Sequence, residues 1–544
     1  MYKFAENSNT IYKKERKDIF MKNPFVFREP EDKDIFVLKE DMPSDEDSKP
    51  FKISRNIKEN EEYLKKRFSV PENNDVVIRK FQLKGNRNAF VIFYDGMANG
   101  AFISSNVIKS MQYIPLLCDE DLKLKQEEIL FKFISNSQAQ PEKDIEKIID
   151  EINFGSCGVF VDGLDIGFSI DVRAWEHRTV QKPNNEQSVF GPQEAFNEML
   201  RSSSALVRKI LKTEKLICKG VEVGKVSKTR GVLMYLSDVA NDSLVDEALR
   251  RINGIEADYI FAVEEVGNFI KDAKLSVTNQ LLTTERPDRT ARYLADGRVA
   301  LILSGSPSAL ILPTNAFELL HSPSDSYMNS IFVNAARIIR LIAALISVLL
   351  PGVYLALTLF HQEMIPTYLL YSISASRENV PFPSVLELLL MDFSFEMIRE
   401  AGLRMPGVLG STLGIVGGLI LGQAAVSAKI VSPIMIIIIA ITGIGSFATG
   451  NYSLGWSYRI LRFMFIVLGA SFGFFGISTG VFVYSVYIGT LKSFGIDFLF
   501  PTGENKLRNA LFAKNVWSDE RRPSFLKTKD SKKEEKISRS WLFR

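Results

Sequence analysis

Cysteine and histidine, which build disulfide frameworks and most zinc sites, are almost missing from this sequence. Its 544 residues include three of each. Cys118, Cys157 and Cys218 are odd in number and far apart, so they form neither a disulfide framework nor a metal-binding CxxC pair. The three histidines are equally scattered and indicate no zinc site.

Signatures of nucleotide chemistry, covalent catalysis and nucleic-acid binding are missing as well. No stretch has the GxxxxGK[ST] pattern of a phosphate-binding loop, and none forms a nucleophile elbow. Lys and Arg total 67 against 64 Asp and Glu, and a net charge of +3 lacks the basic excess of a nucleic-acid binder. We therefore expect no enzyme, no cofactor, no metal site and no nucleic-acid partner.

An apolar export segment is also missing from the first 330 residues, so the sequence predicts no signal peptide. The N-terminal region is therefore expected to stay in the cytoplasm. The reducing conditions of that compartment suit three unpaired cysteines.

Charge is distributed very unevenly along the chain. Residues 330–500 carry 16 charged side chains in 171 positions, about 9%, whereas the remaining 373 residues carry 115, about 31%. The average composition therefore hides two different parts. We expect an α/β cytoplasmic region of two subdomains, followed by an α-helical transmembrane domain of four to five spans.

The predicted domain boundaries follow shifts in composition. Residues 1–65 are too charge-dense to bury an apolar core, so we expect a disordered extension there. The other predicted parts are subdomain 1 (66–187), subdomain 2 (188–325), the transmembrane domain (326–500) and a basic cytoplasmic tail (501–544).

Short apolar runs predict the strands of both subdomains. In subdomain 1 these are a strand at 89–94 and a hairpin formed by 158–163 and 166–170. In subdomain 2 they are a strand at 231–236 and a hairpin formed by 299–303 and 309–312. Helices are expected at 194–211 and 246–252, and the segment 182–185 predicts a loop between the subdomains.

Four runs without Asp, Glu, Lys or Arg predict the membrane spans, because about 20 apolar residues cross the hydrocarbon core as a helix. The runs are 341–362, 405–428, 430–458 and 463–491. The last run is rich in glycine, which predicts a bend or a split. An even number of spans places the N-terminal region and the tail, which has twelve Lys and Arg after Lys492, together in the cytoplasm.

An acidic helix is expected between the first two runs. Asp392, Glu396 and Glu400 lie at i, i+4 and i+8, so they share one face, with Arg399 and Arg404 close by. One interpretation is a solvated interfacial helix with internal ion pairs. The other is an acidic vestibule that attracts cations, in which the carboxylates face water or a partner subunit.

The second run carries two stripes. Small residues at four-residue spacing predict close helix packing in lipid, either within one subunit or between copies. These are Gly410, Gly414, Gly418 and Gly422. A stripe that is polar at both ends and apolar in the middle lies roughly opposite and is typical of a pore-lining face. It consists of Thr412, Val416, Leu419 and Gln423.

Two segments of the soluble region, 191–196 and 285–289, have the pattern of a turn followed by a helix start. Pro192 suits a first helical turn, and Glu194 interacts favourably with the helix dipole. Taken alone, these segments indicate structure rather than chemistry.

Together, five stretches resemble the A subunit of GerA-type germinant receptors of endospore-forming bacteria. They are GPQEAFNEMLRSSSALVRKI at 191–210, ERPDR at 285–289, ADGRVALILSGSPSALILP at 295–313, LELLLMDFSFEMIREAGLRMPG at 386–407 and GLILGQAAVSAKIVSP at 418–433. The resemblance extends from about residue 70 to about residue 505, and the block 386–433 is its most specific part.

This resemblance implies a multi-pass protein of the inner spore membrane that works with a permease-like B subunit and a lipoprotein C subunit. It also implies that copies of the chain form a homo-oligomer in membrane lipid, which conducts monovalent cations when nutrient binds and so triggers germination. The alternative is a scaffold, signal-transducing subunit or transporter component that does not itself conduct ions. A secondary transporter usually shows more spans and a repeated half, and neither is visible here.

Overall fold

A computed structural model describes residues 38, 51–83, 87–112, 139–173, 182–183, 185–404, 418, 420–448, 450–499, 512–513 and 521–533. All of these residues belong to one unit, Leu38–Arg544.

Subdomain 1 is built on a five-stranded antiparallel sheet with the order β1-β2-β4-β5-β3. Its strands are β1 (Val76–Gln82), β2 (Asn88–Tyr94), β3 (Ala139–Glu142), β4 (Cys157–Val161) and β5 (Gly167–Ile170). The predicted strand at 89–94 is therefore confirmed as β2. The predicted hairpin is β4 and β5, which pair with each other in antiparallel register.

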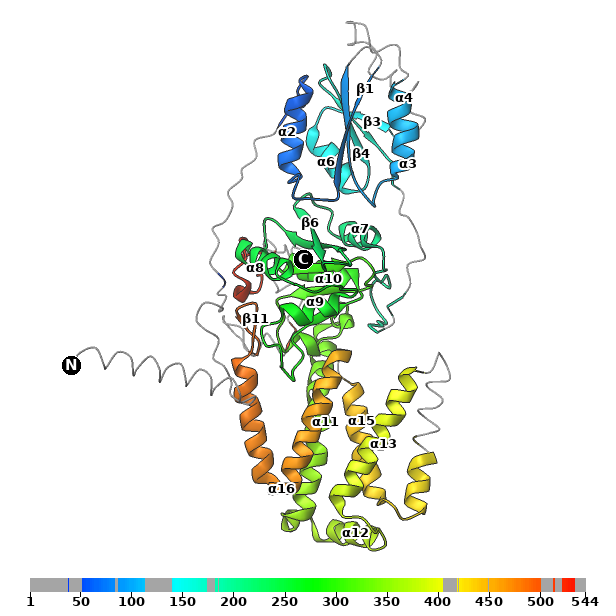
Figure 1. The fold of residues 1–544 in the computed structure, drawn as a ribbon, viewed down its shortest axis with the longest axis vertical. Helices are drawn as coiled ribbons and strands as arrows, with labels where there is room; N and C mark the ends of the chain where they lie inside the picture. Colours follow the sequence, from blue (N-terminus) through cyan, green and yellow to red (C-terminus); the bar gives the residue numbers. More distant parts are fainter. Residues whose placement is uncertain are drawn as a thin grey trace, which may run out of the picture. The chain divides into compact units, whose positions relative to one another are not determined.

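Helices cover both faces of this sheet (Figure 1). On one face, α2 (Ile57–Arg67) and α6 (Ile145–Asn153) pack against Phe90 and Ile92. On the other face lie α3 (Gly100–Phe102), the π-helix η1 (Ile103–Ile108) and α4 (Lys109–Gln112). Helix α2 corrects the predicted disorder up to residue 65: its buried Ile57 and Leu64 give this charged segment an apolar face.

Subdomain 2 repeats the arrangement, with an antiparallel sheet in the order β6-β7-β9-β10-β8. Its strands are β6 (Leu216–Val223), β7 (Thr229–Leu236), β8 (Leu282–Thr284), β9 (Val299–Leu303) and β10 (Ala309–Leu312). Its helices are α7 (Leu200–Ile210), α8 (Asp242–Asn253), α9 (Val263–Ile270) and α10 (Pro287–Ala295). The predicted strand and hairpin of this subdomain are confirmed as β7 and the β9-β10 pair.

The first helix of subdomain 2 begins later than predicted, at Leu200 instead of 194. Its N-cap residue is Met199, and Ser203 Oγ donates to the backbone carbonyl of Asn197 (2.9 Å), which fastens the chain just before the helix. Pro192 and Glu194 are therefore outside the helix. Glu194 forms an ion pair with Lys209 instead (2.7 Å).

An arginine joins the two subdomains. Arg208 of α7 is buried, forms an ion pair with Asp75 at the start of subdomain 1, and stacks on the Tyr94 ring at 4.1 Å. The backbone N–H of Asn74 also donates to the carbonyl of Cys218 on edge strand β6 (3.0 Å). The buried interface therefore links α7 and β6 to subdomain 1 through charge and backbone pairing.

The described residues after subdomain 2 include the helices α11 (Ser330–Leu359), α12 (Thr367–Arg377), α13 (Ser384–Arg404), α15 (Pro433–Phe447) and α16 (Tyr452–Thr490), and residues 420–427 are also helical. Of the described helices, α11 and α16 are long and apolar enough to cross a membrane, and α15 is a shorter apolar helix. The first and last predicted runs therefore correspond to α11 and α16. Most of the second run, 405–428, lies outside the described residues.

The third run, 430–458, is not one helix. It is interrupted between α15 and α16, where Asn451 caps the new helix by accepting from Ser453 N–H. A Cβ on Gly450 would lie 2.8 Å from the carbonyl oxygen of Leu320, so the chain here passes too close to its neighbour for a side chain. The prediction of a single span over this run is wrong.

Helix α16 consists of two arms, drawn in orange in Figure 1. They meet at Gly473, whose φ of 58° and ψ of −141° interrupt the helical backbone. The predicted bend in the glycine-rich run is therefore confirmed. The first arm approaches α11 closely: a Cβ on Gly352 would lie 2.5 Å from the carbonyl oxygen of Phe465.

Part of the basic tail packs on subdomain 2. Lys529 donates to the carbonyl of Ser237 (3.0 Å) and forms an ion pair with Asp242 (2.6 Å), and Arg522 Nε donates to the carbonyl of Ala295 (2.9 Å). Leu526 is fully buried. Residues 521–533 therefore return to the soluble region after the membrane helices.

The bend at Gly473 generates a stability prediction. We expect Gly473→Ala to destabilise the full-length protein in detergent by about 1–3 kcal/mol, because an L-residue strains at this backbone conformation. The new Cβ would also lie 2.9 Å from His361 Cε1. Thermal unfolding measures the effect. Gly489→Ala is the matched control, since its Cβ meets nothing within 4 Å; equal melting temperatures for the two variants would contradict the prediction.

Candidate functional site: a buried ion-pair network in the helical domain

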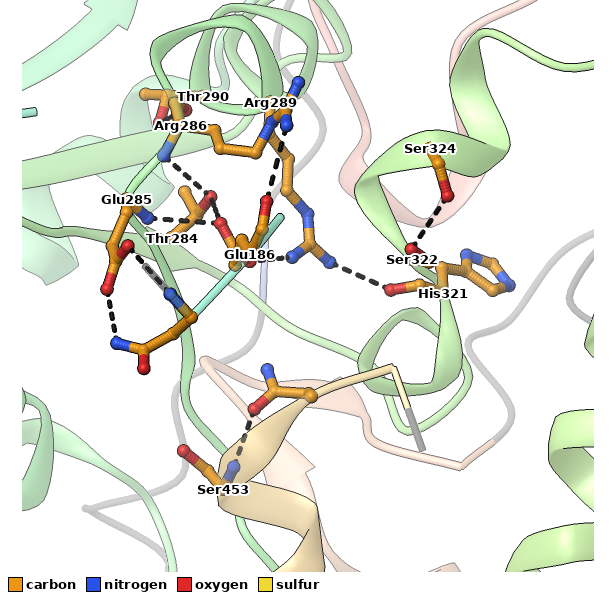
Figure 2. Close-up of polar contacts among 12 residues, drawn as sticks. Glu186, Thr284, Glu285, Arg286, Arg289, Thr290, His321, Ser322, Ser324 and Ser453 are labelled. Carbon is orange, nitrogen blue, oxygen red and sulfur yellow. Dashed lines mark hydrogen bonds and ion pairs between the residues drawn. The ribbon is translucent and has the colours of Figure 1, made fainter. Parts of the chain in front are cut away.

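The segment 285–289, one of the five distinctive stretches, surrounds a single carboxylate. Glu186 accepts hydrogen bonds from Thr284 Oγ1, from the backbone N–H of Glu285 (3.2 Å) and from Arg289 Nη1 (2.5 Å). Figure 2 shows these groups pointing toward Glu186 from the start of α10 and the strand before it. Arg289 also reaches the carbonyl of His321 (3.4 Å).

The neighbouring Arg286 is fully buried and holds the loop in front of α7. It forms an ion pair with Asp288 (2.9 Å) and donates to the carbonyl of Pro192 (2.7 Å). The cluster therefore ties the segment 185–192 to α10. These contacts fit the interpretation that both segments serve structure.

Subdomain 2 also holds the ends of the membrane helices. Thr278 bonds with Tyr484 (3.1 Å), Tyr487 donates to Ser276 (2.9 Å), and the N–H of Asn279 donates to Ser457 (3.0 Å). Both arms of α16 therefore contact the segment 276–279. Leu454 and Leu491, at opposite ends of α16, belong to the hydrophobic core of subdomain 2.

A cluster of ion pairs at the start of α11 attaches this helix to the loop that precedes it. Asp325 accepts two hydrogen bonds from Arg340, each 2.8 Å long, and one from Arg337 (3.3 Å). Burial raises the pKa of Asp325, but the hydrogen bonds and charges of these arginines outweigh it, so the pKa lies below its ordinary value. The bidentate geometry fixes the orientation of α11 relative to the loop that precedes it.

The most heavily charged buried site lies between α13 and α16. Arg462 is 1% exposed and forms ion pairs with Asp392 (3.1 Å) and Glu396 (2.6 Å). Arg399 also pairs with Glu396, and Arg459 lies 3.8 Å from it. Three guanidinium groups and two carboxylates therefore meet in the interior of the helical domain.

Helix α13 has its polar side turned inward. The exposed positions on its outer side include Leu386, Leu390, Phe393 and Met397, all apolar. Its buried positions include Glu387 and Asp392, which are fully enclosed. Apolar side chains outside and charges inside are typical of a helix surrounded by lipid rather than by water.

This arrangement corrects the expectation that the acidic stripe faces water. Asp392 is completely buried, and Glu396 points to Arg399 and Arg462. The third member, Glu400, is partly exposed and forms an ion pair with Arg404 one turn away (2.8 Å). The stripe is therefore divided between an internal network and one surface pair.

Most of the stripes on the second run lie outside the described residues: Gly410, Thr412, Gly414, Val416 and Leu419. Among the described residues, a Cβ on Gly418 would meet nothing within 4 Å, and one on Gly422 would make only ordinary contact with Ile436. Gln423 is exposed. Close packing and pore lining at these positions stay predictions.

Sequence reasoning missed Glu387, Arg459 and Arg462. The two arginines lie between the predicted spans 430–458 and 463–491, which places them outside any span, whereas both lie inside α16. One signal was available: a charge-free run of 29 residues is longer than one span requires, and Gly450 with Asn451 marks a break within it.

The comparisons with known proteins agree with the distinctive stretches. The model of the Bacillus/Clostridium GerA spore germination protein family matches residues 62–525. The chain belongs to the GerA family. It is 35% identical over 501 residues to spore germination protein KA of Bacillus subtilis. The alignment covers 91% of each chain. It is also 33% identical over 482 residues to the uncharacterized membrane protein YfkQ of the same species, covering 88% of this chain and 93% of the relative.

Among solved structures, the chain is similar to the N-terminal domain of the A subunit of the Bacillus megaterium spore germinant receptor GerK3. The match covers 48% of this chain and 97% of that domain, with 24% identity and a TM-score of 0.38. The family match confirms the resemblance seen in the sequence. The described residues of this family member include two candidate membrane-spanning helices.

The buried network generates a prediction for Arg462. We expect Arg462→Met to destabilise the full-length protein by about 3–5 kcal/mol, because Asp392 and Glu396 lose their shared buried partner. Arg404→Met is the matched control and should cost less than about 1 kcal/mol, since its pair with Glu400 is solvent-exposed. Thermal unfolding in detergent measures both. Similar losses for the two variants would show that burial does not strengthen the network.

A second prediction concerns pH. Because the pKa of Asp325 is lowered in the folded protein, its stabilising effect is complete above the ordinary Asp value of about 4 and is lost as pH falls below it. We expect Asp325→Asn to lower the free energy of unfolding at pH 7 by about 3 kcal/mol, with a smaller deficit near pH 3. The exposed Asp258→Asn serves as control. A deficit independent of pH would contradict the ionic role of Asp325.

Proposed function

We propose that this chain is the A subunit of a nutrient-responsive germinant receptor in the inner spore membrane. Copies of the chain assemble around the segment 410–423 into a nutrient-gated channel for monovalent cations. A permease-like B subunit and a lipoprotein C subunit complete the receptor. The N-terminal region and the tail lie on the cytoplasmic side.

The observation that carries this proposal is the continuous set of contacts from the soluble region to α13, the helix that precedes the segment 410–423 in the sequence. Both ends of α16 are anchored in the core of subdomain 2, and its first arm is joined to α13 through Arg462. Helix α13 ends at Arg404, and the segment 410–423 follows it in the sequence. A displacement of subdomain 2 would therefore be transmitted to the candidate pore helix through buried contacts that resist bending.

The composition of the candidate pore face supports conduction. Thr412 and Gln423 offer polar groups at its two ends, and Val416 with Leu419 forms an apolar constriction between them. Such a constriction closes a pore by excluding water. The small residues at 410, 414, 418 and 422 would allow neighbouring helices to approach closely. Gly418, open within one chain, is available to a second copy.

The second candidate function is a scaffold or signal-transducing subunit that does not conduct. The same mechanical connection favours it, because a rigid link between subdomain 2 and the helices can pass a signal to another subunit. The two functions differ in one measurable property. A conducting subunit changes ion permeability when its constriction is altered, whereas a scaffold only loses activity.

The test compares spores that carry single substitutions in the second run. We expect Val416→Ala and Leu419→Ser to release monovalent cations without nutrient, because a smaller or more polar side chain hydrates the constriction. Gly414→Leu should abolish nutrient-induced release, because a large side chain separates the helices. Flame photometry of the medium measures the release.

Ile420→Ala, at an exposed position one residue from the stripe, is the matched control and should behave as wild type. Opposite effects from the two groups of variants cannot both arise from lost stability. If Val416→Ala and Leu419→Ser only reduce the nutrient response, the scaffold function replaces the channel.

A further inference from the structure

Unpaired polar atoms are concentrated on the inner side of α13. Among the described residues, thirteen buried side-chain nitrogen and oxygen atoms have no hydrogen-bond partner. Nine of them belong to α13 or to side chains that face it from α11, α12 and α16. A buried polar group without a partner is costly, so such a concentration requires an explanation.

One group of these atoms surrounds Glu387. Its Oε1 accepts from the backbone N–H (2.5 Å) and the hydroxyl (2.6 Å) of Ser432, at the N-cap of α15. Its Oε2 has no hydrogen-bond partner and lies 3.6 Å from Arg377 Nε, which has none either. Glu387 is completely buried, so one carboxylate oxygen is satisfied and the other is not.

Two hydroxyl groups without partners lie beside this carboxylate. Ser384 is buried and precedes Glu387 by three residues, which places both side chains on the same side of α13. Tyr354 of α11 packs in the same cluster as Leu388 and Met391 of α13, and its hydroxyl has no hydrogen-bond partner among the described residues. An acceptor, a donor and two hydroxyls therefore meet where four elements converge.

The second group lies further along α13, around Asp392, which is also buried. Among the described residues, both oxygens of Asp392 lack a hydrogen bond, although Asp392 forms an ion pair with Arg462. The Nε atoms of Arg462, Arg399 and Arg459 lack partners as well. Here too, donors and acceptors are unpaired in the same place.

The mixture of donors and acceptors identifies the ligand. A bound cation would satisfy the carboxylate oxygens but not the guanidinium N–H groups, and a bound anion would do the reverse. Water donates and accepts, and buried waters usually bridge several such polar groups. We propose that the inner side of α13 lines a hydrated seam, in which water bridges Glu387, Ser384 and Tyr354 at one end and Asp392 and the arginines at the other.

The seam does not depend on conduction along the proposed pore face of 412–423. It allows charged side chains to stay ionised inside an apolar helical domain. On the outer side of the same helix, Leu386 and Leu390 are exposed, as expected for a face that contacts lipid.

The first experiment measures hydration directly. Ser384→Cys and Leu386→Cys are compared in the full-length protein reconstituted in vesicles, with labelling by 2-aminoethyl methanethiosulfonate. The two positions lie at nearly the same depth on opposite sides of α13, and this reagent reacts with the thiolate, which forms only in water. We expect Ser384→Cys to react at least about tenfold faster than Leu386→Cys. Equal rates, or faster labelling of Leu386→Cys, would overturn the seam.

The second experiment uses the sign of a stability change. Ser384→Ala and Tyr354→Phe each remove one hydroxyl and little volume. If water bridges these hydroxyls, both variants should melt at a lower temperature than the wild type. If the site is dry, removing an unsatisfied buried hydroxyl should raise the melting temperature. A rise in either variant would overturn a seam that includes that residue.

Discussion

A buried guanidinium shared by two carboxylates sets the register of the helical domain. Arg462 of α16 reaches both Asp392 and Glu396 of α13. A shift of one residue moves a side chain by about 1.5 Å along a helix and rotates it by about 100°. Such a shift would leave the charges unpaired in apolar surroundings, which is far less favourable than any apolar mismatch. The ion pairs of Arg462 with Asp392 and Glu396 therefore allow only a few positions of α13 relative to α16.

The same helix is constrained at both of its ends. Because α16 bends at Gly473, both ends return to subdomain 2, where Leu454 and Leu491 join its core. A straight helix of 39 residues would place these ends far apart, so one end would leave the soluble region. The bend therefore makes subdomain 2 and the α16 arms one packed body. Close approach at Gly352 then attaches α11 to that body.

The soluble sheets could be predicted closely because their strands depend on local pattern. The apolar runs around Val91 and Val232 are bounded by turn residues, and each became a buried strand. The start of α7 could not be predicted in the same way, because the N–H of Phe196 donates to the carbonyl of Glu285 (2.8 Å), a tertiary contact that holds the chain just before Leu200. Helix α2 was missed because a charged segment needs only a few buried side chains, such as Leu64, to pack.

Which side of α13 faces the protein interior could not be derived from its sequence, for a more general reason. A periodic pattern shows that Asp392 and Glu396 share one side, but it does not say whether that side faces water or protein. The answer depends on Arg462, 66 residues later, which neutralises the carboxylates. The same pairing explains why counting charge-free runs misplaced the spans. An arginine bounds a span only when it reaches water; Arg459 and Arg462 are paired internally, so α16 continues through them. Counts of spans from charge-free runs therefore fail wherever two helices exchange buried charges.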